Sequence, residues 1–340
     1  MTRMIDLRSD TVTRPTEVMR AVMARADVGD DVWRGDPTVA ALEAQVAERT
    51  GMAAGLFVPS GTQGNLTALL VHCQRGEAFI AGQSSHIYLD EGGGAAALGS
   101  IQAQPIAHQV DGTLNLGAIE NAISGEDIHH TQTRLLALEN TYNGKVMPDA
   151  WQADATTLAR HHGLATHLDG ARLFNAAVAS GRSLASLCEG FDSVSLCFSK
   201  GLGAPVGSIL LGDTDFIERA RRWRKTLGGG MRQVGILAAG CRHALEQHVE
   251  RLAEDHHNAR RLAEGLADID DIAIEACDTN MVFIALPGDH CQALEAFMAS
   301  RGILLAAAPR MRLVTHLDVS TADVRRVVTE MHAYFSRQSA

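Results

Sequence analysis

One lysine, Lys200, stands where a reactive amine would be expected. It follows an apolar run that contains Val194, Leu196 and Phe198, and glycines come soon after it at positions 201, 203 and 207. A strand that ends in such a turn would hold the amine on a short, fixed base, partly removed from water. Partial desolvation lowers the pKa of a lysine and frees its amine to form a Schiff base with a carbonyl group. The alternative is a solvated surface lysine, which is the commoner case for this pattern alone.

An aspartate and an arginine precede Lys200 in the stretch His167-Leu-Asp-Gly-Ala-Arg172. The stretch closes a short apolar run, and a helical pattern follows it. Asp169 and Arg172 are therefore three residues apart at a predicted strand-to-helix turn, where both can face one cleft. A carboxylate there can keep a heterocyclic nitrogen protonated, and an arginine can fork onto a carboxylate. A local ion pair that only fastens the turn is the alternative.

A third motif, Gly55-Leu-Phe-Val-Pro-Ser-Gly-Thr-Gln63, is typical of a strand that leads into a helix. Gly61 and Thr62 would lie in the first helical turn, which has unpaired N–H groups and the positive end of the helix dipole. Together with the threonine hydroxyl, these groups make a seat for a phosphate. No Gly-Lys-Ser/Thr follows, so the motif is not a nucleotide P-loop. A helix with an ordinary cap is the alternative.

Taken together, the motifs resemble those of the low-specificity L-threonine aldolases, pyridoxal-phosphate enzymes of the aspartate-aminotransferase fold type (fold type I). The resemblance extends over nearly all 340 residues. It rests on residues 5–15, 59–63, 138–146, 167–172, 199–203, 228–233 and 312–318, in that order. One position departs from the pattern: many relatives have a tyrosine in the loop after Gly29-Asp-Asp-Val32, where this chain has Trp33 followed by Arg34. Any role that the tyrosine phenol has in those relatives therefore cannot be assigned to Trp33 from the resemblance.

The resemblance implies a role for each candidate residue. Lys200 would form the Schiff base with pyridoxal 5'-phosphate, and Asp169 would pair with the pyridine nitrogen. His86 would stack on the ring, and His129 would lie near the substrate hydroxyl. The phosphate would be bound by Gly61 and Thr62, together with Lys225 and Arg232 from a neighbouring subunit. The substrate carboxylate would be bound by Ser9, Arg172 and Arg312. Arg172 would thereby lie close to the cofactor as well.

The order of the predicted elements indicates an α/β fold. Short apolar runs alternate with helical patterns as far as residue 212, as in a parallel sheet with helices on both faces. A long helix is predicted through Leu245 to Leu266, followed by strands near 272–276, 281–286 and 313–316. We expect an N-terminal arm and a large cofactor-binding domain over residues 1–245, and a small α/β domain over 246–340. The resemblance implies a mainly parallel, seven-stranded sheet in the large domain.

Composition disfavours several classes of protein. A net charge of −10 without a Lys/Arg block argues against nucleic-acid binding. The start of the chain has no apolar signal core, and no stretch reaches the ~18 apolar residues of a membrane span, so we expect a cytoplasmic protein. The six scattered cysteines are expected to be reduced. Several of the fifteen histidines form adjacent pairs, and none has His-x-x-x-His spacing, so no metal site is expected.

The predicted reaction is cleavage of L-threonine and L-allo-threonine to glycine and acetaldehyde by a homotetrameric carbon–carbon lyase. Related β-hydroxy-α-amino acids are further expected substrates. The carboxylate clamp would orient the Cα–Cβ bond, and His86, His129 or an ordered water would take the hydroxyl proton. Because only a hydroxyl identifies the β-centre, we expect both L-isomers to be cleaved, the allo form better, and D-threonine to be refused.

Three alternatives differ in class. Another pyridoxal-phosphate enzyme, such as a phenylserine aldolase, a β-eliminating lyase or an aminotransferase, would use the same candidate residues. A nicotinamide-dependent oxidoreductase is disfavoured, because no Gly-x-Gly-x-x-Gly follows an early strand. A non-catalytic binding module would leave the set of Lys200, Asp169 and Arg172 unexplained.

Overall fold

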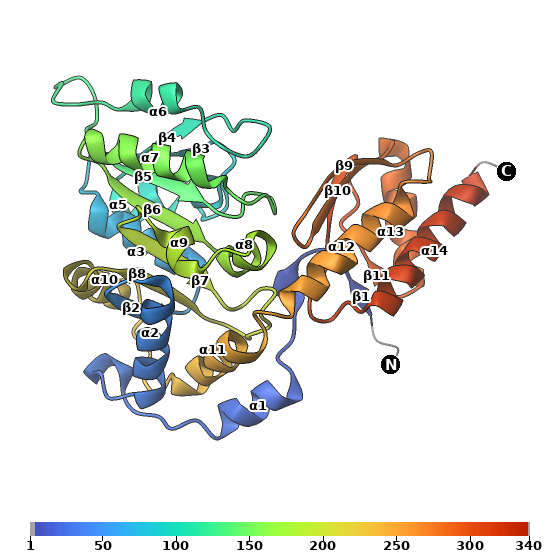
Figure 1. The fold of residues 1–340 in the computed structure, drawn as a ribbon, viewed down its shortest axis with the longest axis horizontal. Helices are drawn as coiled ribbons and strands as arrows, with labels where there is room; N and C mark the ends of the chain where they lie inside the picture. Colours follow the sequence, from blue (N-terminus) through green and yellow to red (C-terminus); the bar gives the residue numbers. More distant parts are fainter. Residues whose placement is uncertain (1–3, 339–340) are drawn as a thin grey trace.

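The structure, a computed structural model, describes residues 4–338; residues 1–3 of the expected N-terminal arm and residues 339–340 lie outside it. Figure 1 shows two lobes. The larger lobe contains the long sheet, and the smaller one contains β9, β10, β11, α13 and α14. The first and last described segments, β1 and α14, both lie at the smaller lobe. Within the described range, no helix combines the length and the apolar character that a membrane span requires.

A seven-stranded sheet in the order β2-β8-β7-β6-β5-β3-β4 forms the large lobe. Its strands are β2 (Ala54–Val58), β3 (Ala78–Gly82), β4 (Gln102–Ile106), β5 (Thr133–Glu139), β6 (Ala165–Gly170), β7 (Ser193–Cys197) and β8 (Ser208–Gly212). Only β8 runs against its neighbours, β7 and β2, and the remaining pairs are parallel. The expected α/β fold with a mainly parallel seven-stranded sheet is therefore confirmed.

Helices cover both faces of this sheet, because successive strand residues point to opposite sides. In β5, Leu136 and Leu138 pack into one apolar cluster, and Leu135 and Ala137 pack into another on the opposite face. The helices of the large lobe are α1 (Glu17–Ala24), α2 (Pro37–Thr50), α3 (Gly61–His72), α4 (His86–Leu89), α5 (Gly94–Gly99), α6 (Leu116–Ala122), α7 (Asp149–His161), α8 (Leu173–Ser180), α9 (Leu184–Cys188), α10 (Thr214–Thr226) and α11 (Gly235–Gln247). Short 3-10 turns lie at η1 (Asp10–Val12) and η2 (Asp31–Trp33).

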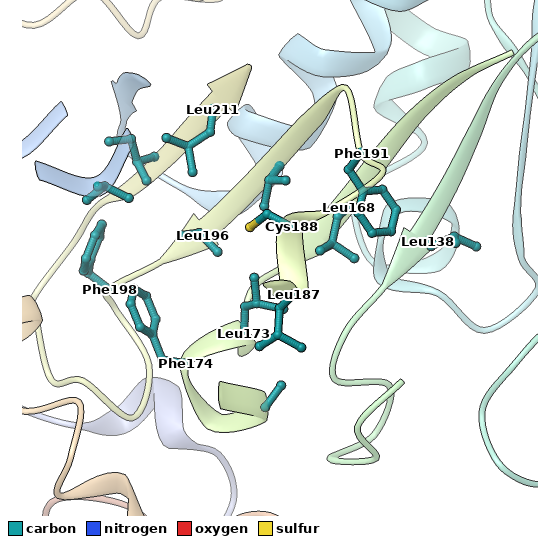
Figure 2. Close-up of a cluster of buried hydrophobic side chains, with 14 of the residues drawn as sticks. Leu138, Leu168, Leu173, Phe174, Leu187, Cys188, Phe191, Leu196, Phe198 and Leu211 are labelled. Carbon is teal, nitrogen blue, oxygen red and sulfur yellow. The ribbon is translucent and has the colours of Figure 1, made fainter. Parts of the chain in front are cut away.

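The largest cluster fixes the strands that end at the candidate site. Figure 2 shows Leu168 of β6 and Leu196 of β7 beside Leu173 and Phe174 of α8 and Leu187 of α9. Each of these side chains is almost fully buried. Burial of one such side chain stabilises the fold by roughly 1.5–3 kcal/mol. Close packing on this scale leaves little freedom to the ends of β6 and β7.

The small lobe is built on an antiparallel sheet in the order β12-β10-β9. Its elements are α12 (Leu252–Leu266), β9 (Ala273–Asp278), β10 (Met281–Ala285), η3 (Gly288–His290), α13 (Cys291–Ser300), β11 (Ile303–Leu304), β12 (Arg310–Val314) and α14 (Thr321–Gln338). The last helix, α14, begins after Ser320, whose hydroxyl accepts from the N–H of Asp323.

The prediction of a single long helix through Leu245 to Leu266 is wrong. The structure divides it into α11 and α12, with residues 248–251 between them. The two helices have different partners, since α11 packs against α1 and α2 whereas α12 packs against α14 and β9. His248, at the break, also forms a hydrogen bond through Nδ1 to the carbonyl of Leu202. The exact domain boundary at 245/246 stays a prediction.

An N-terminal strand ties the two lobes together. Strand β1 (Ile5–Asp6) pairs in parallel with β11 of the small lobe, and the N–H of Val314 donates to the carbonyl of Leu7. A few residues later, the Thr13 hydroxyl donates to the carbonyl of Lys200 in the large lobe, at 2.7 Å. The residues around 5–13 therefore connect the small lobe directly to the turn that carries the candidate lysine.

Candidate active site

The candidate residues gather at one edge of the large sheet. Parallel strands place their carboxyl ends at the same edge, which is where ligands bind in sheets of this kind. Gly61 follows β2, His86 follows β3, Glu139 ends β5, Asp169 lies near the end of β6, and Lys200 follows β7. Glu139 and Asp169 are direct neighbours in the register of β5 and β6. Motifs that are far apart in the sequence thus lie together in the folded chain.

Lys200 lies in the tight turn after β7. Its carbonyl accepts from the Thr13 hydroxyl at 2.7 Å and from the N–H of Gly203 at 2.9 Å. Gly203 has a φ of +77°, a conformation that favours glycine. The positive charge of Lys200 acts to lower the pKa of Asp10, Glu139 and Cys197, so its amine lies among these groups. Lys200 is thus partly buried, and hydrogen bonds hold its backbone in place.

Asp169 is only 3% exposed, and both of its carboxylate oxygens accept hydrogen bonds. The N–H of Ala171 donates to Oδ1 at 3.0 Å, and the amide of Asn65 donates to Oδ2 at 2.8 Å. A buried carboxylate held in this way at the end of β6 is suited to pair with a protonated heterocyclic nitrogen.

His86 begins the short helix α4 between two carboxylates. Its backbone N–H donates to Glu139 at 3.0 Å, and its Nδ1 lies 2.9 Å from Glu91 Oε1. The hydrogen bond to Glu91 raises the pKa of His86, although burial acts in the opposite direction. Burial and the nearby charge of Asp169 raise the pKa of Glu139. The site is therefore rich in carboxylates that a bound cation or a protonated ring would neutralise.

Sequence reasoning missed Glu91 and Glu139 as well as Asn65. Glu139 could have been found by the argument that identified Asp169, since both lie at the end of a buried strand. His86, Glu91 and Asp169 also present ligand atoms within 4.8 Å of one another, a spacing that a metal ion could use. The Asn65 amide already donates to both carboxylates of this group, which gives their negative charge a partner.

The start of helix α3 carries the residues of the expected phosphate seat. The Ser60 hydroxyl caps the N–H of Gln63, and the Ser60 carbonyl accepts from Gly64. The N–H groups of Gly61 and Thr62 belong to the first helical turn, where no carbonyl of the same helix reaches them. A Cβ at Gly61 would lie 2.7 Å from Cys197 Sγ, so a side chain there would collide with the end of β7. The seat therefore adjoins the turn of Lys200.

Lys225 and Arg232 are both exposed. Lys225 lines a cavity of about 850 Å³ beside α10, together with Arg222 and other residues. Arg232 forms an ion pair with Asp30 at 3.0 Å. Between them, Gly229 packs on the first turn of α3, since a Cβ there would lie 1.9 Å from Gln63 Oε1. This loop thus flanks the phosphate seat of its own chain, while the two cations face outward.

The expected carboxylate clamp is assembled from three separate segments. Arg172 makes two hydrogen bonds with buried Asp10, from Nε at 2.8 Å and from Nη2 at 2.6 Å. Burial alone would raise the pKa of Asp10, but the charge of Arg172 holds it well below its usual range. This pairing uses two of the five guanidinium N–H groups, so three remain for another anion.

Arg312, on β12 of the small lobe, lies near Arg172. Burial lowers its pKa, and the positive charge of Arg172 lowers it further. Two arginines that repel each other in a partly buried place favour an anion between them. The Ser9 hydroxyl forms hydrogen bonds with the N–H and the hydroxyl of Thr11 and caps η1, on the segment that also carries Asp10.

Two positions lie apart from this cluster within the chain. His129 comes before β5, at the amino edge of the sheet, and pairs with Asp127 at 2.9 Å. Its side chain is 78% exposed. Trp33, on η2, is 81% exposed, and the neighbouring Arg34 forms an ion pair with Glu218. The structure therefore does not bring His129 to the Lys200 site of the same chain.

Comparison with known proteins agrees with this architecture. The model of the beta-eliminating lyase family matches residues 6–287. The chain is 52% identical to the low specificity L-threonine aldolase of Escherichia coli O157:H7, with 98% of this chain and 100% of the relative covered. It is 45% identical to a probable low-specificity L-threonine aldolase 2 of Arabidopsis thaliana, with 96% of each chain covered.

A solved structure has the same fold. The Leishmania major threonine aldolase superposes with a TM-score of 0.84 at 23% identity, covering 99% of this chain and 100% of that one. At this identity the likeness establishes the arrangement of the elements, and the sequence comparisons carry the assignment of family. The chain is thus a member of the beta-eliminating lyase family and groups there with the low-specificity L-threonine aldolases.

Proposed function

We propose that the protein is a pyridoxal-phosphate-dependent carbon–carbon lyase that cleaves L-threonine and L-allo-threonine to glycine and acetaldehyde. The observation that carries the proposal is the convergence of Lys200, Asp169 and the open first turn of α3 at one edge of the sheet. The 52% identity to a low specificity L-threonine aldolase over nearly the whole chain supports the same activity. Related β-hydroxy-α-amino acids are further substrates.

The residues present fit the cofactor. Lys200 supplies an amine for its aldehyde, Asp169 a carboxylate for its ring nitrogen, and Gly61 and Thr62 donors for its phosphate. When bound, pyridoxal phosphate supplies an electron sink for the pair released from the breaking Cα–Cβ bond. Asp169 maintains this capacity, because its charge keeps the ring nitrogen protonated.

The clamp determines which bond can break. Ser9, Arg172 and Arg312 hold the α-carboxylate, and the fork of an arginine fixes its direction. Asp10 fixes Arg172 in turn through two hydrogen bonds. A carboxylate held in this way orients the Cα–Cβ bond toward the face of the ring. The clamp also provides a reason for refusing D-amino acids, in which the carboxylate and the β-carbon are exchanged in space.

His86 is suited to receive the proton of the substrate β-hydroxyl. Its Nδ1 is engaged with Glu91, so Nε2 carries the free lone pair of the neutral ring. An ordered water could take the same proton. His129 lies outside the site of its own chain, so it would act here only from a neighbouring subunit.

We also propose that the enzyme is a cytoplasmic homotetramer. Lys225 and Arg232 are exposed cations beside the phosphate seat, and a neighbouring subunit could place them on a phosphate. Between residues 4 and 338 all six cysteines are free, and four of them are buried, in keeping with a reducing compartment.

The activity is tested with the purified holoenzyme and the four stereoisomers of threonine, without added keto acid. We expect glycine and acetaldehyde from both L-isomers, the allo form being cleaved faster, and no product from the D-isomers. Product that appears only when a keto acid is added would indicate an aminotransferase. Release of ammonia and a keto acid would indicate a β-eliminating lyase. A strong preference for aryl substrates over threonine would favour a phenylserine aldolase.

A further inference from the structure

Asn65, on helix α3, is a central contact of the candidate site. Its Nδ2 donates to Asp169 Oδ2 at 2.8 Å and to Glu91 Oε1 at 2.7 Å. Its Oδ1 lies 3.0 Å from His167 Nε2. An ionised carboxylate can accept hydrogen bonds but cannot donate them. The amide NH₂ must therefore face the two carboxylates, and the amide oxygen must face the histidine. The residue is 1% exposed, and its bonds to Asp169 and His167 are buried.

The bond to Asn65 fixes the proton of His167. Nε2 must carry hydrogen to donate to the amide oxygen, and burial lowers the pKa of His167 to about 3, so the ring is neutral. Nδ1 is therefore an acceptor for the Ser193 hydroxyl, 2.9 Å away. The serine oxygen in turn accepts from His72 Nε2 at 2.7 Å. In this series of hydrogen bonds, which runs from His72 through Ser193, His167 and Asn65, each group donates to the next in the direction of Asp169.

Asn65 separates two negative charges. Asp169 and Glu91 present carboxylate oxygens within 4.8 Å of each other, and the Asn65 amide donates to both. Two carboxylates this close without a shared donor tend to hold one proton between them. A proton on Asp169 would remove the charge that opposes the ring nitrogen. A proton on Glu91 would remove the acceptor of His86 Nδ1.

We propose that Asn65, oriented by His167, is a positioning residue that keeps Asp169 and Glu91 ionised together. Its one amide thereby connects Asp169, the proposed partner of the ring nitrogen, to Glu91, the partner of His86. His167 acts one step further out, and Ser193 and His72 fix its tautomer. This inference rests on the role proposed above for Asp169.

The test compares Asn65→Ala and Asn65→Asp with wild-type holoenzyme. Asn65→Ala removes the shared donor, and Asn65→Asp replaces it with a third carboxylate of the same size. We expect the dissociation constant for pyridoxal phosphate to rise about tenfold and kcat/KM for L-allo-threonine to fall roughly 10- to 100-fold. The pH midpoint of the visible band of the bound cofactor should move by more than about half a unit, since the charge beside the ring has changed.

A second pair of variants tests the orientation of the amide. His167→Gln keeps an N–H that can reach Asn65, and His167→Leu removes it. We expect the Gln variant to stay within about threefold of wild type in all three measurements and the Leu variant to follow Asn65→Ala. Asn258→Ala controls for the loss of a buried asparagine, because Asn258 donates to the Val319 carbonyl far from the site. This control should leave the midpoint unchanged.

Two outcomes overturn the proposal. In the first, Asn65→Ala and His167→Leu fold, as judged by circular dichroism, yet retain the wild-type midpoint and cofactor affinity. In the second, the Gln and Leu variants of His167 behave alike. Asp169→Asn, measured in parallel, separates the two levels of inference. If it is also silent, the proposed role of Asp169 is wrong; if it alone is impaired, only the role of Asn65 is wrong.

Discussion

The two sides of the site are built in different ways. The side proposed to face the ring uses residues from one sheet and from helices packed on it, joined by the hydrogen bonds of Asn65 to Asp169 and Glu91. The side proposed to bind the substrate carboxylate uses Ser9 from the N-terminal segment, Arg172 from the large lobe and Arg312 from the small lobe. One side is fixed by a single core, and the other depends on how two lobes meet.

This difference predicts two kinds of defect. A change on the ring side should affect cofactor chemistry and leave recognition of the carboxylate intact, so kcat should fall more than KM changes. A change in the clamp should weaken binding of the substrate and of its transition state, so KM should rise. Asn280, which donates to Asp10 at 3.3 Å, shows how closely the clamp is linked to the small lobe.

Lys200→Ala should have the largest effect. Loss of the nucleophile should lower kcat by about 10³-fold or more, because no other amine occupies the end of β7. Borohydride reduction of the wild-type holoenzyme should attach the cofactor to the peptide that contains Lys200, as read by mass spectrometry. A label on any other lysine would contradict the whole assignment of the ring side.

Asp169→Asn should come second. The variant keeps the size of the side chain and loses the charge that holds the ring nitrogen protonated, so kcat should fall roughly 10²-fold or more, equivalent to about 2.7 kcal/mol. Steady-state kinetics with L-allo-threonine measure the change, and KM should vary little. Near-normal turnover in this variant would remove the distinction between the two sides.

Arg312→Lys tests the clamp. The charge is kept, but the fork that holds a carboxylate is lost, and kcat/KM should fall roughly 10-fold, or about 1.4 kcal/mol, mainly through KM. Arg310→Lys is the matched control on the same strand, because Arg310 pairs with Glu275 in solvent. A fall in kcat with unchanged KM would show that Arg312 belongs functionally to the ring side.

Lys225→Ala with Arg232→Ala should weaken cofactor binding by up to about tenfold if these cations reach the phosphate of a neighbouring subunit. Mixed oligomers test the arrangement directly. When the double variant is reassembled with Lys200→Ala subunits, the intact Lys200 of the first can combine with the intact cations of the second, and affinity should be restored. Failure of the mixture, or a fully active monomer in sedimentation, would place both cations in their own chain.

The smallest expected effect is on stability in acid. The pKa of Asp10 is lowered in the folded protein, so its ion pair stabilises the fold above the ordinary carboxyl pKa of ~3.9, and this stabilisation is lost as pH falls toward the folded value. The Tm of wild type should therefore fall more steeply between ~pH 5 and ~pH 3 than that of Asp10→Asn. Equal slopes would mean that the Asp10–Arg172 pair does not contribute to stability.

Local sequence patterns indicated Lys200 and Asp169, but not the groups that hold Asp169 and Arg172 in place. Lys200 and Asp169 each follow an apolar run, and parallel strands bring such ends together whatever the length of chain between them. Asp10 gives no comparable local signal, because it lies 162 residues from its partner Arg172. Asn65 gives no local signal either, because its contact with Asp169 spans 104 residues.

The break between α11 and α12 could not be predicted for a related reason. The apolar spacing continues across residues 245–266, as in one helix, and the change of packing partner at 248–251 exists only in the tertiary structure. The outcome for His129 is similar. Its place before β5 puts it at the amino edge of the sheet of its own chain, which a likeness of motifs does not show.

The pairing of β1 with β11 also sets an order of events during synthesis on the ribosome. Ile5 and Asp6 leave the ribosome early, but their partners Ile303 and Leu304 appear only after nearly all of the described chain has been made. The large sheet, complete at Gly212, can form well before then. Until β11 emerges, Asp10 and Thr13 lack the anchor that directs them to Arg172 and Lys200. A nascent chain can thus acquire its core while its candidate pocket is still open, and activity should appear only after β11 has emerged.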